Sequence, residues 1–203
     1  MTCYFSEKVI EDVIAFHGHS CPGLAIGIRV AELAMRKFGD QDSTEMVTVS
    51  ETDMCGVDAI QFLTDCTYGK GNFIHRDYGK MAFSFFDRLS EKGFRVLLKP
   101  DARGAVGVQL DTLTELTGSE SEAAATQQKI TQLRQQLQER FMSLPLEEMF
   151  DVTQLDSGIP RPAAILQTLV CECCGEAMME SRSRRFNGKV LCIPCFATVE
   201  QKI

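Results

Sequence analysis

The sequence His17-Gly18-His19-Ser20-Cys21-Pro22-Gly23 separates two stretches whose apolar residues have helical spacing. Before it, residues 6–16 carry apolar side chains three and four positions apart, and Ser6 is a suitable N-cap. After it, proline is tolerated as the first residue of a helix, which we expect to run to Phe38. The stretch therefore predicts a break between two helices, with Cys21 at the N-cap of the second.

The same stretch concentrates side chains that bind metals. It holds two of the chain's three histidines together with a cysteine, and both side-chain types are ligands for soft or borderline transition metals. At an N-cap, free backbone N–H groups and the helix dipole favour the thiolate form of Cys21. The structural alternative is a capped helix start with two surface histidines. We expect instead a partly open transition-metal site at Cys21 with His17, His19 or both, and these three residues are also the candidates for catalysis.

Two further cysteine motifs follow a predicted strand. Cys55 comes just before a short predicted helix, on which Asp58 and Gln61 share one face because they lie three residues apart. Cys66 lies in a glycine-interrupted loop that lacks the spacing of a phosphate-binding P-loop, although Lys70 and backbone amides there are suited to hold an anion. Cys55 and Cys66 are second choices as metal ligands. The alternative is that both are small buried packing residues.

The rest of the first three quarters of the chain predicts a mixture of helices and strands. Strands are expected at 46–50, 81–86 and 94–98, and a short helix at 57–63. A long amphipathic helix is expected from about 118 to 141. Its narrow apolar stripe consists of Ile130, Leu133, Leu137 and Phe141. We expect this helix to pack across the sheet, and a dimer seam is the less favoured alternative. Another amphipathic stretch follows from 144 to 155.

A linker is predicted at Ser157-Gly158-Ile159-Pro160-Arg161-Pro162, because proline and glycine are concentrated there. We therefore place a domain boundary at this point, which gives a domain of residues 1–156 and a second segment of residues 157–203.

The second segment carries two C-x2-C pairs separated by seventeen residues, which is a spacing expected of a four-thiolate structural zinc site. The four predicted ligands are Cys171, Cys174, Cys192 and Cys195. A hairpin with an Asn-Gly turn at 184–191 and a closing helix at 193–201 complete an order that resembles a treble-clef zinc finger. Four buried free thiols are the alternative, but about 40 residues form too small a core without a staple. Cys173 is treated as a spare thiol.

Composition limits the function classes. The chain has 203 residues, nine cysteines and a formal charge of −7, so most of its surface would repel nucleic-acid phosphates. A basic cluster of Arg182, Arg184 and Arg185 lies in the finger, but no aromatic platform accompanies it, and nucleic-acid binding is not expected. No apolar run is long enough to cross a bilayer and no signal peptide is visible at the start. A cytoplasmic location is therefore the expectation.

Four motifs in order resemble the family of the E subunit of formylmethanofuran dehydrogenase: residues 17–23, 55–61, 66–72 and 77–80. The resemblance covers roughly residues 10–140 and implies an α+β fold, a homodimer and a pocket that joins the first two cysteine regions. It also implies a protein partner in the context of a molybdenum or tungsten enzyme, although the family name does not establish a reaction. By motif position, the pocket residues are His17, His19, Cys21, Cys55, Asp58, Gln61, Cys66, Thr67 and Lys70. Asp65 departs from the family pattern, in which we expect glycine.

We therefore expect a metal-binding protein with a structural zinc finger and a second transition-metal ion in the His/Cys pocket. Two other functions stay open. In one, the chain is a thiol-dependent oxidoreductase in which Cys21 is the nucleophile, a histidine is the base, and Cys55 or Cys66 is the resolving thiol. In the other, the chain is a regulator whose finger contacts nucleic acid or protein.

Overall fold

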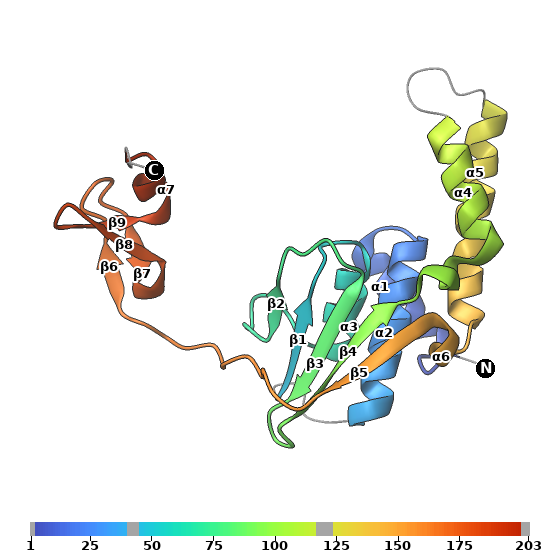
Figure 1. Ribbon diagram of the computed structural model, residues 1–203, viewed down its shortest axis with the longest axis horizontal. Coiled ribbons are helices and arrows are strands. Elements are labelled where there is room, and N and C mark those ends of the chain that lie inside the picture. The colour runs from blue at the N-terminus through green and yellow to red at the C-terminus, as the bar shows by residue number, and fades with distance from the viewer. Residues whose placement is uncertain (1–2, 40–44, 117–123, 200–203) are drawn as a thin grey trace. The chain divides into compact units, whose positions relative to one another are not determined.

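The computed structural model describes residues 3–39, 45–116 and 124–199 (Figure 1). The chain divides into two compact units, Met1–Pro162 and Ala163–Ile203, and each is described by itself. The helices and strands of the two units confirm the mixed α+β class and the small C-terminal finger. Within the described residues, no helix is both long and apolar enough to span a membrane.

The first unit is built on a five-stranded sheet with the strand order β2-β1-β3-β4-β5. β1 (Met46–Ser50) pairs in parallel with β2 (Phe73–His75) and antiparallel with β3 (Ala82–Asp87). β4 (Lys92–Leu98) and β5 (Phe150–Leu155) continue the sheet in antiparallel pairing. The strands predicted at 46–50, 81–86 and 94–98 are confirmed within one or two residues, because their β-branched and aromatic residues are buried in the sheet.

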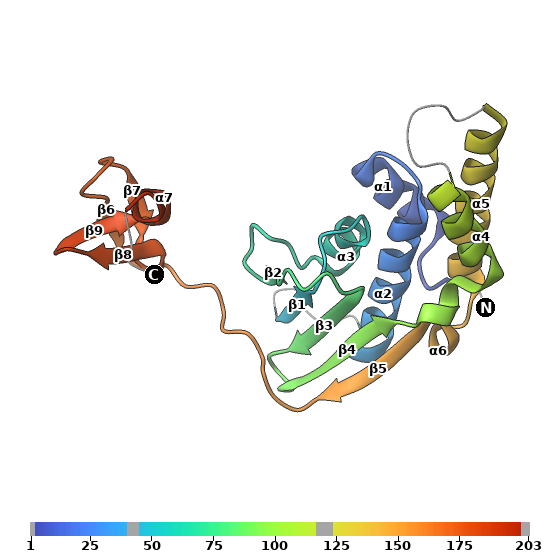
Figure 2. The same cartoon turned by 45° about the horizontal axis from the view of Figure 1, so that its top comes forward.

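Three helices are grouped beside the sheet (Figure 2). α2 (Pro22–Phe38) and α3 (Gly56–Thr64) contribute apolar side chains to the core formed with β3 and β4, and α1 (Glu7–His17) packs against both helices. The predicted caps are confirmed. The Ser6 side chain accepts a hydrogen bond from the Val9 amide at 3.4 Å, and the Cys21 side chain accepts one from the Leu24 amide at 3.3 Å.

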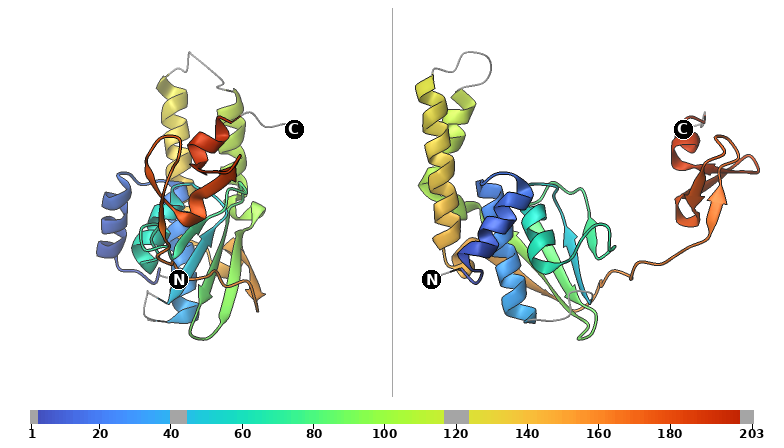
Figure 3. Two further views of the ribbon diagram at one scale, coloured as in Figure 1. Left: turned by 90° about the vertical axis from the view of Figure 1, so that its left-hand side faces the viewer. Right: turned by 180° about the vertical axis from the view of Figure 1, so that it is seen from behind.

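A pair of helices extends past the end of the sheet (Figures 1 and 3). α4 (Gly104–Leu116) follows the short 3₁₀ helix η1 (Pro100–Arg103) and lies beside α5 (Ala124–Ser143). The apolar stripe of α5 packs against α2 and α4, and the expectation that it crosses the sheet is wrong. α4 was not predicted from the sequence, because its glycines and weak apolar periodicity hide the helix. The start predicted near 118 lies outside the described residues.

The stretch 144–155 contains two elements of different type. A single helical turn, α6 (Leu146–Met149), is followed directly by β5 at the edge of the sheet. Pairing with β4 sets the strand conformation there, because only Phe150 of β5 is buried and the segment has little apolar pattern of its own. After β5, Ile159 packs against apolar side chains of the sheet, including Val47 and Phe86.

The second unit consists of two short hairpins and a closing helix. β6 (Thr168–Val170) pairs with β7 (Ala177–Met179), and β8 (Ser183–Phe186) pairs with β9 (Lys189–Cys192). Between them lies the 3₁₀ turn η2 (Glu180–Arg182), and the closing helix α7 spans Ile193–Ala197. The predicted Asn-Gly turn is confirmed, since φ is +47° at Asn187 and +80° at Gly188. The predicted closing helix is shorter than 193–201 and its last residues lie outside the described range.

Candidate metal centres

The four cysteines predicted as zinc ligands converge in the second unit. One ligand atom from each of the residues Cys171, Cys174, Cys192 and Cys195 lies within 4.8 Å of the others. The Cys192 amide donates a hydrogen bond to the Cys171 Sγ at 3.2 Å, and the Cys195 amide donates one to the Cys192 Sγ at 3.4 Å. Backbone N–H groups of Cys174 and Cys192 lower the pKa of Cys171 to about 6, which favours its thiolate. The arrangement fits a structural zinc site, and Cys173 is exposed and outside the cluster.

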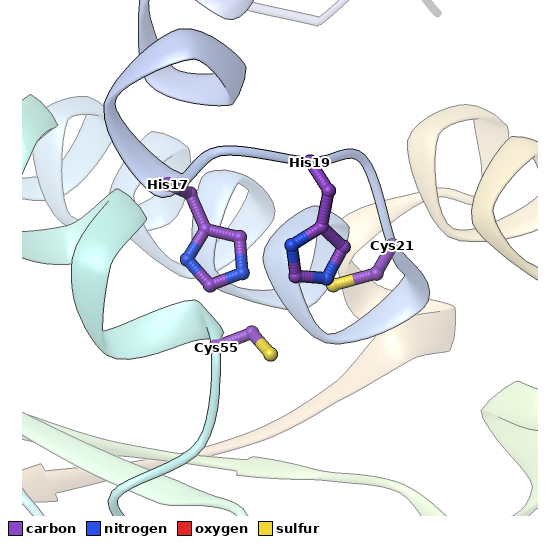
Figure 4. A group of neighbouring side chains, drawn as sticks. All are labelled: His17, His19, Cys21 and Cys55. Atoms are coloured by element: carbon purple, nitrogen blue, oxygen red, sulfur yellow. The ribbon is translucent and has the colours of Figure 1, made fainter.

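A second cluster forms in the first unit from four separate positions (Figure 4). His17 is the last residue of α1, His19 lies in the following loop, Cys21 is the N-cap of α2 and Cys55 is the N-cap of α3. Their side chains point toward one another, and their ligand atoms lie within 4.8 Å of one another. The two imidazole rings have centroids 4.5 Å apart. The structure therefore brings Cys55 together with the three residues of the histidine and cysteine loop.

The two nitrogens of His17 have different surroundings. Nδ1 lies 2.7 Å from Oδ2 of Asp58, so it donates its proton to this carboxylate and Nε2 carries the lone pair. Nε2 is buried and has no hydrogen-bond partner among the described residues. A buried polar atom without a partner costs roughly 1–3 kcal/mol. A metal ion at Nε2 would remove this cost, and a carboxylate on the other nitrogen is the usual partner of a metal-bound histidine.

Glycines bring the start of α3 close to the start of α2. A Cβ atom at Gly27 would lie 2.2 Å from the carbonyl oxygen of Gly56, and one at Gly23 would lie 3.3 Å from the Cβ of Cys55. Only glycine allows this approach, which places the cysteines at the two helix N-termini side by side. This role was not predicted from the sequence. The signal was the four-residue spacing of Gly23 and Gly27, which puts both on one face of α2.

Electrostatics in this cluster favour a bound cation. Burial, followed by the contact with Cys21, raises the pKa of the Cys55 thiol, so this group alone keeps its proton. Both cysteines lie at helix N-termini, where the dipole stabilises negative charge. A metal ion would displace the thiol proton, because coordination supplies the positive charge that two adjacent thiolates require.

The remaining pocket residues predicted from the sequence lie elsewhere. Cys66 is fully buried in the main core and its thiol donates a hydrogen bond to the Met46 carbonyl oxygen at 3.3 Å. It therefore contacts neither Cys21 nor the cluster, and it cannot resolve a disulfide with Cys21 in this fold. Gln61 accepts a hydrogen bond from the Tyr68 amide, and Thr67 accepts one from the Lys70 amide. These two contacts hold the loop that follows α3.

Asp65 occupies the place where glycine is expected. Its φ is +57°, which is a left-handed conformation that glycine adopts freely and aspartate tolerates better than most residues. The backbone therefore keeps the conformation of a glycine. The added carboxylate lies 2.5 Å from the Lys70 ammonium group, so that Lys70 is already paired and is poorly suited to hold an external anion.

Comparisons with known proteins agree with both parts of the chain. Residues 16–151 match the family described as "FmdE, Molybdenum formylmethanofuran dehydrogenase operon". The chain belongs to the FmdE family. Residues 165–201 match the prokaryotic dksA/traR C4-type zinc finger, which confirms the metal-binding finger of this FmdE protein.

Two individual proteins resemble this FmdE chain. A "Probable S-adenosyl-L-methionine-binding protein" of Archaeoglobus fulgidus is 28% identical over 192 residues, which are 89% of this chain and 50% of the relative. The chain thus spans about half the length of that curated relative. The crystal structure of an FmdE-like protein of the tungsten formylmethanofuran dehydrogenase type, from Syntrophus aciditrophicus, has 23% sequence identity and a TM-score of 0.64. The match covers 97% of both chains and supports the fold.

Proposed function

We propose that this FmdE-family protein binds two metal ions: the zinc of the finger and a transition-metal ion held by the cluster of His17, His19, Cys21 and Cys55. The carrying observation is the buried Nε2 of His17, which has no hydrogen-bond partner among the described residues and lies near three other ligand atoms. Two imidazoles and two thiolates suit zinc and other borderline or soft divalent ions. In this proposal Asp58 orients His17 and is not itself a ligand.

The four positions differ in their access to solvent. The His17 side chain is 10% exposed, whereas His19 is the exposed member of the cluster. An incoming molecule would therefore displace His19 more easily than His17. A divalent ion bound here would supply Lewis-acid chemistry to a molecule in the adjoining cavity. The protein's own contribution is to hold the donors in place and to fix the proton of His17 on Nδ1.

Elemental analysis of anaerobically purified protein tests this proposal. The unchanged chain is expected to hold two metal ions, and Cys21→Ser is expected to hold one, because a serine hydroxyl is a poor substitute for a thiolate ligand. Cys173→Ser is the matched control, since this exposed thiol lies outside both clusters, and it should keep two ions. One ion in the unchanged chain, together with a reactive Cys21 thiolate, would contradict the proposal and favour thiol chemistry between Cys21 and Cys55.

We also propose a homodimer, a cytoplasmic location and a protein partner in the context of a molybdenum or tungsten enzyme. The description of the family, with its formylmethanofuran dehydrogenase operon, supports the partner. The cysteines are all free, and in a chain so rich in them this favours a reducing compartment. Val108 on the projecting helix pair is 66% exposed, which supports an apolar contact with a second chain.

A further inference from the structure

A cavity of about 1000 Å³ lies directly beside the His/Cys cluster. This volume is at the upper end of the range of roughly 300–1,000 Å³ that is usual for small-molecule sites. His19, Cys21 and Cys55 line one end of it. Further along, the wall is apolar and is formed by Ile26, Met54, Met81, Leu98, Leu137 and Phe141. A molecule in this cavity would therefore have an apolar body and one end against the metal centre.

The charge of the cavity has the opposite sign to that of the whole chain. Its described lining residues include two arginines and no aspartate or glutamate, although the chain carries a formal charge of −7. Arg103 is neutralised, because its two terminal nitrogens each lie 2.7 Å from a carboxylate oxygen of Asp111. Arg134 of α5 forms no salt bridge with any described residue. It is therefore the unpaired positive charge of this lining.

α5 places Arg134 at a defined position relative to the metal loop. Gln138 lies four residues later on α5, and its Nε2 donates a hydrogen bond to the Ser20 hydroxyl at 2.6 Å. Ser20 lies between the candidate ligands His19 and Cys21. Residues four apart on a helix share one face, about one turn apart. Arg134 is thus one helical turn beyond the contact that ties α5 to the cluster.

We propose that the cavity binds an amphipathic organic anion. Its carboxylate or phosphate group is held by Arg134, its apolar body contacts Met81, Leu137 and their neighbours, and its other end faces the metal centre. The part of this inference that concerns the metal-facing end rests on the proposed metal-binding function. An organic cation is disfavoured, because the described lining offers no carboxylate to pair with it.

Two fluorescent probes with the same aromatic body test the anion site. 1-Anilinonaphthalene-8-sulfonate carries a sulfonate, and N-phenyl-1-naphthylamine is its neutral counterpart. In the full-length metal-loaded protein, Arg134→Gln is expected to raise the Kd of the sulfonate about tenfold, because a charge-assisted contact is lost. The neutral probe should bind unchanged. Lys129→Gln removes a charge from the same helix outside this cavity and is expected to leave both affinities unchanged.

A second variant locates the probes. Thr131 is an exposed residue of α5 that lines the cavity, and Thr131→Phe is expected to fill part of the space and weaken both probes. Equal sulfonate binding in the unchanged protein and Arg134→Gln would overturn the inference, as would equal losses of both probes in Arg134→Gln or no effect of Thr131→Phe. Metal content is measured on every sample. A single ion in the unchanged chain overturns the two-metal proposal, whereas dependence of the sulfonate on Arg134 reports the anion site independently.

Discussion

His17 shows how one side chain can reveal a binding site. Its Nδ1 is held by Asp58 at 2.7 Å, which leaves Nε2 as an acceptor in a buried place without a protein donor among the described residues. A histidine that only filled space would more favourably turn its second nitrogen to solvent or to a donor. The arrangement costs stability in the metal-free protein, and a bound ion would offset that cost.

Asp58→Asn tests the orienting role of this carboxylate. The amide keeps the size of the side chain but loses the charge that raises the basicity of His17, so metal affinity at the N-terminal centre is expected to fall about 10- to 100-fold. Competition with a chromophoric chelator measures the affinity of each centre, and the finger should be unaffected. Asp53→Asn is the control, because this nearby carboxylate is exposed and outside the cluster. Equal losses in both variants would contradict a specific role of Asp58.

At the scale of elements, the contact between α2 and α3 decides whether the cluster exists. Gly27 and Gly56 pack backbone against backbone, and Gly23 lets Cys55 approach the first turn of α2. Because the two helix N-termini meet there, cysteines 34 positions apart in the chain supply one set of donors. The same two N-termini place positive dipole ends beside the thiols.

Gly27→Ala is expected to disturb this contact. The added Cβ would lie 2.2 Å from the Gly56 carbonyl oxygen, so the helices must separate. Overpacking of this kind costs about 1–3 kcal/mol, which outweighs the gain of roughly 1 kcal/mol in helix propensity from glycine to alanine. Urea unfolding measures the loss of stability, and metal analysis should show a depleted N-terminal centre.

Gly69→Ala provides the comparison for this prediction. Gly69 is exposed and a Cβ there meets no atom within 4 Å among the contacts described, so its replacement should change stability by less than about 0.5 kcal/mol. If Gly27→Ala proved as stable and as rich in metal as Gly69→Ala, the close helix contact would not be what positions Cys55.

At the scale of the whole molecule, the two units depend on metal to different degrees. The first has a core that joins α2, the sheet, α4 and α5, with large buried side chains such as Phe83, Phe85 and Phe94. The buried core of the second consists of Cys171, Leu191 and Cys192. So small a core cannot offset the chain entropy of about 40 residues, and zinc must supply the difference.

The proposed homodimer is a property of the complete chain. Sedimentation equilibrium is expected to give a mass close to twice 22.6 kDa, because a second copy would cover the exposed Val108 and its surroundings on the projecting helix pair. A mass of one chain at concentrations of tens of micromolar would contradict the homodimer. Additional mass in material purified from the native host would identify the proposed partner.

The sequence by itself determined the features that depend on neighbouring residues. The N-caps Ser6 and Cys21, the breaks around them, the central strands and the C-x2-C pairs of the finger follow from short-range spacing, and the structure confirms them. Local backbone geometry produces these patterns, so they remain readable without knowledge of the fold.

Only the tertiary structure decided which distant residues meet. From sequence, Cys55 and Cys66 were equal second choices, yet the glycine contact of α2 with α3 brings Cys55 to His17, while Cys66 turns into the core. The conformation of β5 and the cavity beside Arg134 likewise arise from partners far away in the chain. Long-range packing makes these choices, because burial and close approach depend on which surfaces face each other, and residue spacing alone does not encode that.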